Sequence, residues 1–320
     1  MKAIAIDDFD TRPALHDLPR PEPAEAPVLV RMQASSVNGY DVAVTNGALS
    51  DVTYEFPIVL GRDFAGTVEA IGVGVTGFEI GERVFGVNMK PRLGMPLKDG
   101  TFAEFTSVPT EFVAKIPDGV MTEDAGALGL AGSAALASLD AIAPVKGVTV
   151  LISGATGGVG AFAVQLAKAR GATVIATATA EFTDYVIKLG ADYSVDHTDD
   201  LAAAVRSSHP DGVDAIVHLA GDIDALVALL KPGGRAASTL GIDASARDAD
   251  VTSVKATFDT QALESLVASG AKGDLSVPIR VTYALADVPS ALDDFTTGTQ
   301  GKLSIRIPQE ANGYPDGLRG

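Results

Sequence analysis

The stretch that most restricts the fold of this chain is residues 148–160, which reads VTVLISGATGGVG. An apolar run with strand character passes through a glycine-rich turn into a segment with helical spacing. This arrangement is typical of dinucleotide-binding sheets, because the free N–H groups at the start of the helix face a pyrophosphate. The glycines leave room for a sharp turn, for the ligand and for close packing of helix on strand. We therefore predict a dinucleotide site here; the alternative is a glycine-rich turn that binds nothing.

The residues that follow alternate between strand and helix patterns. Strands are expected at 173–177, 193–196, 213–218 and 235–240, and helices at 161–170, 182–189, 201–206 and 223–230. The strand segments are short, continuous and rich in Val and Ile, as in a sheet that is covered on both faces. This alternation predicts right-handed βαβ units and an α/β fold with a doubly wound parallel sheet.

The segments on either side of this region have a different character. Before residue 121 we expect strands at 3–6, 28–32, 64–71, 83–87 and 102–108, with loops at 19–27 and 88–100. After residue 257 we expect helices at 261–268 and 287–295, strands at 277–281 and 303–307, and a loosely ordered tail at 308–320. This returning segment is expected to complete the first domain. We therefore predict a β-rich catalytic domain of residues 1–121 and 259–320, and a dinucleotide-binding domain of residues 122–258 inserted into it.

Charge and composition exclude several classes of protein. The chain has 24 basic and 41 acidic residues and a net charge of −17, which repels nucleic acid and anionic membrane surfaces. It has no cysteine, so disulfides, Cys-ligated zinc, iron–sulfur clusters and thiol catalysis are excluded. Asp7 and Asp8 come too early for a signal peptide, and the longest weakly polar stretch, 125–139, falls short of the ~20 residues of a membrane span. We expect a cytoplasmic protein without nucleic-acid or membrane partners.

The four histidines predict no metal site, because none of them forms an HxxxH or HExxH pair. The strand that ends at Thr177 has no carboxylate there to bind a ribose hydroxyl, which favours NADPH over NADH. No Lys or Arg lies between Gly171 and Ile187 to bind the additional phosphate, so NADH is not excluded. His197 follows the neighbouring strand, where it could stack on the adenosine end of the cofactor and bind the phosphate when protonated; the alternative is a surface histidine.

Several short motifs follow one another in a specific order: FPIVLGRDFAGTV (56–68), FEIGERV (78–84), GTFAE (100–104), QLAK (165–168), LLKPGGR (229–235) and GK (301–302). With the glycine turn, they resemble the zinc-independent medium-chain dehydrogenases/reductases, in particular the NADPH:quinone oxidoreductase and enone reductase branch. The resemblance extends from residue 1 to about residue 307. It implies a Rossmann domain inserted into a split, distorted β-barrel of the GroES-like type, and a homodimer.

The resemblance also implies chemistry without a metal. Zinc-dependent members carry G-H-E where this chain has Gly61-Arg62-Asp63, and a Cys ligand where it has Asn38. The implied reaction is hydride transfer from NAD(P)H to a small molecule, either a quinone or an α,β-unsaturated carbonyl. Two alternatives remain: a dinucleotide-binding sensor or structural protein without turnover, and a metal-free alcohol dehydrogenase.

The predicted site residues follow from these motifs and from the ends of the strands. Asn38, Tyr40 and Asp41 match or replace a motif that lines the nicotinamide pocket, and Tyr40 or water is the expected proton donor. The expected cofactor-binding residues are Gly154, Thr156, Gly157, Gly158, Val159, Gly160, Thr177, Thr179, His197, Leu219, Ala220, Leu240, Gly241 and Lys302. The expected substrate-pocket residues are Tyr54, Arg62 and Ser133. Loop packing is the alternative role of Tyr54, and a surface salt bridge that of Arg62.

The chain departs from the family pattern at several of these places. Gly39 and Tyr40 depart from the nicotinamide motif, and Ala134 stands where a threonine often faces the nicotinamide. Phe182 stands where a basic residue often binds the phosphate of NADPH. These departures concern the proton donor and the cofactor preference, while the fold expected from the resemblance is unaffected.

Overall fold

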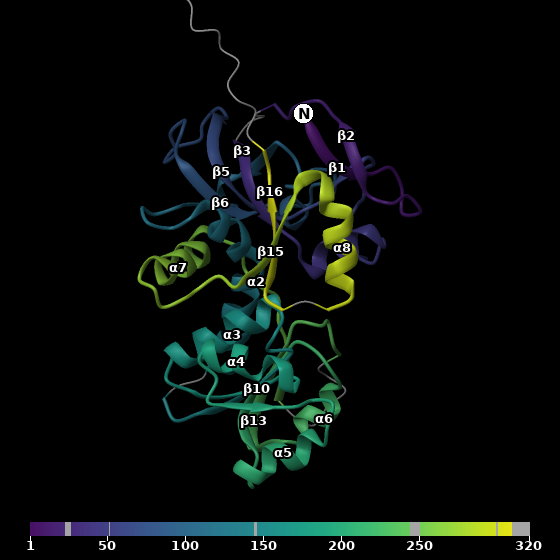
Figure 1. Cartoon of the computed structure of the whole chain (residues 1–320). Coiled ribbons are helices and arrows are strands. Elements are labelled where there is room, and N and C mark those ends of the chain that lie inside the picture. The colour runs from purple at the N-terminus through teal and green to yellow at the C-terminus, as the bar shows by residue number, and fades with distance from the viewer. Residues whose placement is uncertain (23–26, 51, 144–145, 244–249, 299, 309–320) are drawn as a thin grey trace, which may run out of the picture.

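The computed structural model describes residues 1–22, 27–50, 52–143, 146–243, 250–298 and 300–308. Figure 1 shows two parts along the long axis of the molecule: a β-rich part with the N-terminus, and a part built around a parallel sheet. The α/β class with a doubly wound sheet next to a split β-rich unit is confirmed. The domain boundaries at residues 121/122 and 258/259 stay a prediction.

The parallel sheet has six strands in the order β11-β10-β9-β12-β13-β14. Its strands are β9 (Thr149–Ser153), β10 (Thr173–Thr177), β11 (Tyr193–Val195), β12 (Val213–His218), β13 (Leu230–Ser238) and β14 (Asp250–Ser253). Its helices are α3 (Gly158–Ala169), α4 (Thr183–Lys188), α5 (Leu201–Ser208) and α6 (Ile223–Val227), with a short 3-10 helix, η3 (Ala180–Phe182). The strand order reverses direction between β9 and β12, and such a switch point opens a ligand crevice at the carboxyl ends of the strands.

The β-rich part has a seven-stranded sheet of order β15-β16-β3-β5-β6-β8, with β7 paired to β3, and a three-stranded sheet of order β2-β1-β4. The strands are β1 (Lys2–Ile6), β2 (Ala14–Asp17), β3 (Pro27–Ser36), β4 (Ile58–Val59), β5 (Asp63–Ile71), β6 (Arg83–Val87), β7 (Phe105–Pro109), β8 (Val113–Lys115), β15 (Ile279–Ala284) and β16 (Lys302–Arg306). The helices are α1 (Gly39–Thr45), α7 (Thr260–Ala271) and α8 (Val288–Thr296), with 3-10 turns η1 (Lys90–Leu93), η2 (Thr110–Phe112) and η5 (Leu285–Asp287). Because β16 runs antiparallel to β3, with Ser304 opposite Ser36, segments from before and after the parallel sheet share one sheet.

Helix α2 (Thr122–Ile142) joins the two parts, since it contacts β3, β5 and β6 on one side and α3, β12 and β13 on the other. A Cβ at Gly126 would lie 2.8 Å from the Cβ of Ala34, so glycine allows the helix to approach β3 closely. The helix is longer than the stretch 125–139, and by length and mean hydropathy it could cross a membrane. However, 67% of its most apolar window is buried within the molecule, and packing between two sheets accounts for its apolar sequence.

Some element boundaries differ from the predictions. The strand predicted at 102–108 begins at Phe105, because the carbonyl of Phe102 accepts a hydrogen bond from Ile4 of β1 and the chain crosses to that strand first. The helix predicted at 223–230 ends at Val227, and β13 begins at Leu230 because this residue already pairs with Val213. The strand predicted at 235–240 therefore ends at Ser238, and the one predicted at 277–281 occupies residues 279–284.

Other predictions concern loops and the tail. The loop predicted at 88–100 contains the 3-10 turn η1, and β2, β4, β8, β14 and α1 were not expected from the sequence. The loop predicted at 19–27 ends where β3 begins at Pro27, and residues 23–26 of it lie outside the described residues. Of the tail at 308–320, only residue 308 is described.

Candidate active site

The glycine turn has the geometry that a bound pyrophosphate needs. Gly154 has a φ of +70°, which disfavours other residues, and its N–H donates a 3.0 Å hydrogen bond to Oγ1 of Thr177. A Cβ at Gly160 would lie 2.2 Å from the carbonyl oxygen of Gly154, so a larger residue there would push α3 away from the turn. In contrast, a Cβ at Gly157 would approach only that same oxygen, at 3.6 Å. The space in front of Gly157 at the start of α3 is therefore open.

A cavity of about 410 Å³ opens beside this turn, at the carboxyl ends of β9, β10 and β12. Its lining residues are Ser153, Gly154, Thr156, Thr177, His197, Leu201, Ala220, Gly221, Asp222, Ala225 and Leu226. The structure thus brings together five predicted cofactor residues: Gly154, Thr156, Thr177, His197 and Ala220. A cavity of this size beside a glycine turn, at the switch point of the sheet, fits the adenosine end of a dinucleotide.

The other predicted cofactor residues have several environments. Thr179 Oγ1 is buried and has no hydrogen-bond partner among the described residues. Buried polar atoms normally have a partner, so this hydroxyl is available to bind a ligand. The backbone of Leu219 and Ala220 is tied to Ser153, whose Oγ accepts from Leu219 N at 3.2 Å and donates to Ala220 O at 2.8 Å. Leu240 is exposed. Leu240, Gly241 and Val159 do not line the cavity.

A second group of site residues is built around the fully buried carboxylate of Asp63. Its Oδ2 accepts hydrogen bonds from Ser36 Oγ at 2.6 Å and from Asn38 Nδ2 at 2.8 Å. Its Oδ1 accepts from the backbone N–H of Leu130 in α2 at 2.6 Å. Lys302 Nζ lies 3.6 Å from Oδ2. A buried charge is tolerated when it is paired and hydrogen-bonded in this way.

Lys302 connects the Asp63 cluster to the glycine turn. Its Nζ donates to Asn38 Oδ1 at 2.6 Å and to the carbonyl of Val37 at 3.2 Å. Burial lowers the pKa of Lys302, and Asp63 opposes that shift. A Cβ at Gly158 would lie 2.8 Å from Cδ of Lys302, so the stem of the lysine passes directly beneath the start of α3. The preceding Gly301 also donates its N–H to the carbonyl of Thr156 at 2.8 Å.

Asn38 and Asp41 are held by the protein itself. Asn38 uses its amide nitrogen on Asp63 and its amide oxygen on Lys302, so it acts as a positioning residue in this arrangement. Asp41 accepts a bond from the backbone N–H of Asn38 at 2.8 Å through Oδ2, while its buried Oδ1 has no partner among the described residues. Desolvation raises the pKa of Asp41 to about 7, although the nearby Arg62 acts to lower it.

Tyr40 faces a cavity of about 460 Å³ in front of this cluster. The lining residues are Tyr40, Ala48, Leu49, Ser50, Val52, Met89, Pro91, Arg92 and Lys255. Burial raises the pKa of the Tyr40 hydroxyl, so this group stays protonated at neutral pH and can donate a proton.

The three predicted substrate-pocket residues do not line this cavity. Tyr54 packs in its loop, where its hydroxyl accepts from the N–H of Leu49 at 3.0 Å; this favours the loop-packing alternative. Arg62 is only 1% exposed and donates to the carbonyl of Val59 at 3.0 Å, so the surface salt bridge offered as its alternative is wrong. Its guanidinium lies 6.0 Å from the centre of the Tyr40 ring, behind the cavity. Ser133 is buried in α2, and its Oγ has no partner among the described residues.

The charged residues of the site that were not among the predictions include Asp63, Arg92 and Lys255. For Asp63 the sequence did hold a signal, because a charged pair, Arg62-Asp63, interrupts an apolar strand segment and such charges are buried only when paired. For Arg92 and Lys255 there was none, since Arg92 stands in the short 3-10 turn η1 and Lys255 in a connecting segment, and the course of both depends on tertiary packing.

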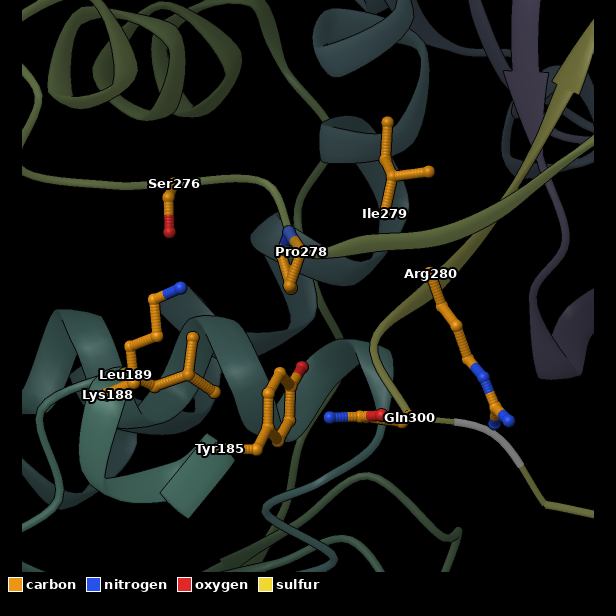
Figure 2. Close-up of a pocket in the computed structure, with 8 residues that line it drawn as sticks. All are labelled: Tyr185, Lys188, Leu189, Ser276, Pro278, Ile279, Arg280 and Gln300. Atoms are coloured by element: carbon orange, nitrogen blue, oxygen red, sulfur yellow. The ribbon is translucent and has the colours of Figure 1, made fainter. Parts of the chain in front are cut away.

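Figure 2 shows a further cavity, of about 370 Å³, where the chain returns past α4 towards β15 and β16. Tyr185 lies in its middle, between Leu189 and Gln300, and Lys188 and Arg280 lie at opposite sides. The hydroxyl of Tyr185 is buried and has no partner among the described residues. None of the predicted site residues lines this cavity, so it is separate from the two cavities described above.

Two family models match the chain. The alcohol dehydrogenase GroES-like domain matches residues 24–118, and the zinc-binding dehydrogenase domain matches residues 158–266. The chain belongs to the medium-chain dehydrogenase/reductase family. Although this family includes zinc-binding members, the described residues contain no group of three or more His, Cys, Asp or Glu side chains that could hold a metal ion.

The relatives of this chain include proteins named for quinone or enoyl-type reduction and others named as zinc-type alcohol dehydrogenase-like proteins. A chloroplast envelope quinone oxidoreductase homolog of Arabidopsis thaliana is 34% identical over 213 residues, which are 64% of this chain and 63% of that protein. An acryloyl-coenzyme A reductase of Sulfurisphaera tokodaii is 30% identical over 214 residues, which are 61% of this chain and 64% of that protein. The match thus spans less than two thirds of the length of these two relatives.

Solved structures match nearly the whole chain. A quinone oxidoreductase from Coxiella burnetii has a TM-score of 0.88 at 28% identity, over 96% of this chain and 99% of that chain. A mycobacterial protein solved in complex with NADPH has a TM-score of 0.81 at 27% identity, over 96% and 99% of the two chains. The fold assigned from the strand order therefore agrees with the fold of the family.

Proposed function

We propose that the protein is an NAD(P)H-dependent oxidoreductase that reduces a quinone or an α,β-unsaturated carbonyl without a metal. The observation that carries this proposal is the position of Lys302. Its stem lies against Gly158 of the glycine turn, and its ammonium group binds Asn38, next to Tyr40. The expected cofactor cradle and the expected acceptor site are thus joined by one side chain. The relatives named as quinone oxidoreductase and acryloyl-coenzyme A reductase support this choice of acceptors.

The glycine turn and the cavity beside it would hold the cofactor as follows. The open space at Gly157 and the N–H groups of α3 suit the pyrophosphate, and the cavity beside Thr177 and His197 suits the adenosine end. When bound, the reduced nicotinamide supplies the hydride. We favour NADPH because β10 ends in Thr177 rather than in a carboxylate, and the relative solved with NADPH supports this preference.

The acceptor would lie in the cavity at Tyr40. Its ring or enone would contact apolar walls that include Leu49, Val52 and Met89. The Tyr40 hydroxyl would give the proton, or water would, and the Asp63 cluster would keep the segment before α1 in place. We propose metal-free chemistry because two cationic side chains, Arg62 and Lys302, already lie among the buried carboxylates Asp41 and Asp63, and a divalent cation would be repelled by them.

A single assay tests this proposal against its two alternatives. Purified protein is mixed with NADPH or NADH and a panel of quinones and enones, and separately with NADP⁺ or NAD⁺ and simple alcohols, and the absorbance of the reduced cofactor is followed in both. We expect oxidation with quinones or enones, unchanged after prolonged treatment with a chelator. Cofactor binding without oxidation would support a sensor, whereas oxidation of simple alcohols with NADP⁺ would support an alcohol dehydrogenase. Loss of activity on chelation that zinc restores would overturn the metal-free part.

We also propose that the protein acts as a homodimer in the cytoplasm on a small-molecule acceptor, without nucleic acid or membrane. The family resemblance suggests the dimer, and the net charge of −17 disfavours the polyanionic partners. Light scattering of the purified chain tests the dimer. Retention on heparin or on anionic vesicles tests the absence of those partners.

A further inference from the structure

The cavity at Tyr40 has cationic groups at two of its edges. Arg92 comes from η1 in the β-rich part, and Lys255 comes from the segment between β14 and α7. Within the described part of the chain, no Asp or Glu lines this cavity. The remaining walls are largely apolar and include Leu49, Val52 and Met89.

Arg92 is oriented but has no anionic partner. Its guanidinium lies 5.2 Å from the centre of the buried Phe258 ring, a cation–π contact that holds the side chain without neutralising it. Asp99, an acidic residue of the same loop, forms an ion pair with Lys90 at 2.5 Å rather than with Arg92. The backbone N–H of Arg92 donates to the carbonyl of Met89 at 2.9 Å, but no hydrogen bond or ion pair joins the Arg92 side chain to another described residue.

Lys255 is likewise exposed and makes no ion pair or hydrogen bond with the described residues. The chain as a whole is strongly acidic, with 41 acidic and 24 basic residues. The two unpaired cationic side chains at this cavity therefore have the opposite sign to the net charge of the protein. Such a local positive potential attracts an anion and raises its concentration at the cavity.

We propose that the acceptor carries an oxyanion, such as a carboxylate, sulfonate or phosphate, which Arg92 and Lys255 bind while its reducible group lies against Tyr40. This inference rests on the proposed function and names its substrate class. The planar fork of an arginine suits two oxygens of one oxyanion, and a lysine adds a point charge. The apolar walls suit the hydrocarbon part of the same molecule. In the reaction the acceptor gains a hydride and a proton, NADPH becomes NADP⁺, and the oxyanion is unchanged.

The two cations come from different parts of the molecule. Arg92 belongs to the β-rich part, whereas Lys255 follows the last strand of the parallel sheet. An oxyanion that binds both therefore bridges the two parts across the cavity. We expect the binding energy of this bridge to be seen mainly in KM, because the oxyanion lies away from the reacting atoms.

The test compares naphthoquinone with naphthoquinone sulfonate as acceptors at saturating NADPH. The variants are Arg92→Gln, Lys255→Gln and the double variant. The control is Lys98→Gln, which removes one exposed charge from the same loop as Arg92 but does not line the cavity. We expect each single variant to lower kcat/KM for the sulfonate about tenfold through KM, as for one lost charge-assisted hydrogen bond. The ratio of kcat/KM for the sulfonate to kcat/KM for naphthoquinone should therefore fall about tenfold in each single variant and stay at the wild-type value in Lys98→Gln, and added salt should lower this ratio in the wild type.

Failure of this inference differs from failure of the proposed function. If the ratio of the two kcat/KM values is the same in wild type and in both single variants, the oxyanion site is wrong while the reductase remains. If Lys98→Gln lowers the ratio as much as Arg92→Gln does, the effect comes from net charge, and the site is again wrong. If neither naphthoquinone is reduced, the quinone form of the proposed function falls, and this inference falls with it.

Discussion

The ammonium group of Lys302 donates a 2.6 Å hydrogen bond to the amide oxygen of Asn38, a residue 264 positions earlier in the chain. Both side chains are buried, and both also lie against the carboxylate of Asp63. The contact joins the start of β16 to the segment before α1. The arrangement of the acceptor site therefore depends on a strand that comes from the far end of the sequence.

Replacing Lys302 with Met should destabilise the fold strongly. The variant leaves Asp63 and Asn38 without their cation in a buried site, and such losses cost about 3–5 kcal/mol of unfolding free energy. Urea unfolding measures the change. The control is Lys115→Met, which breaks an exposed pair with Glu82 and should cost at most about 1 kcal/mol. Equal effects of the two variants would contradict the structural role of Lys302.

Replacing Gly157 with Asp should abolish cofactor binding and spare the fold. Gly157 has a φ of −76°, and a Cβ there meets the protein only at 3.6 Å, so a side chain is tolerated. It would extend into the space predicted for the pyrophosphate, where like-charge repulsion should weaken NADPH binding about a hundredfold or more. Fluorescence titration of NADPH and thermal unfolding measure the two effects.

Gly160→Ala is the matched control, because it should lower the stability of the fold, whereas Gly157→Asp should lower only the affinity for the cofactor. The alanine Cβ would lie 2.2 Å from the carbonyl oxygen of Gly154, so we expect loss of stability before any selective loss of binding. If Gly157→Asp binds NADPH as well as the wild type, the glycine turn is not the cofactor cradle.

Asp41 should make stability fall as the pH rises. Burial raises its pKa to about 7 in the folded protein from 3.8, so between those values the folded state keeps a proton that the unfolded state has lost. The contribution is fully present below about pH 4 and is lost as the pH approaches 7, by at most about 4 kcal/mol. Asp41→Asn cannot titrate, so its unfolding free energy should change less over this range. If the unfolding free energies of wild type and Asp41→Asn change with pH by the same amount, Asp41 is ionised throughout this range and the prediction is wrong.

His197→Ala should weaken NADPH binding more than NADH binding. His197 lines the adenosine cavity together with Thr177, and no Lys or Arg is among the described residues that line it. A protonated imidazole would form a charge-assisted hydrogen bond with the additional phosphate, and loss of this bond should lower the affinity for NADPH about tenfold. The control is His209→Ala, whose ring packs on Tyr193 at 5.3 Å and does not line the cavity. Equal losses for the two cofactors would remove His197 from the phosphate site.

The parallel sheet was predictable because its determinants are local. Each strand is a short apolar run, each helix has its own spacing, and the glycine turn marks where they begin. The errors occurred where a distant partner decides the outcome. Leu230 reads as the end of a helix but pairs with Val213, and the chain at Phe102 crosses to β1 instead of continuing as a strand. Such tertiary pairings override local patterns.

The candidate site was predictable only in part, for the same reason. The turn residues and the strand ends could be placed from their order along the chain. The Asp63 cluster could not, because it collects side chains from β3, β5 and β16 and a backbone N–H from α2. Arg62 shows the same limit: its sequence position is compatible with a surface salt bridge, whereas the structure buries it behind Tyr40.

The pairing of β16 with β3 has a consequence for how a ribosome must make this protein. The segments of the parallel sheet precede residues 302–306 in the chain and are free to fold while those residues are still being added. During that interval β3 lacks its β16 partner, and an open strand edge of this kind invites pairing with other chains. We therefore expect the nascent chain to depend on chaperones most strongly just before β16 emerges.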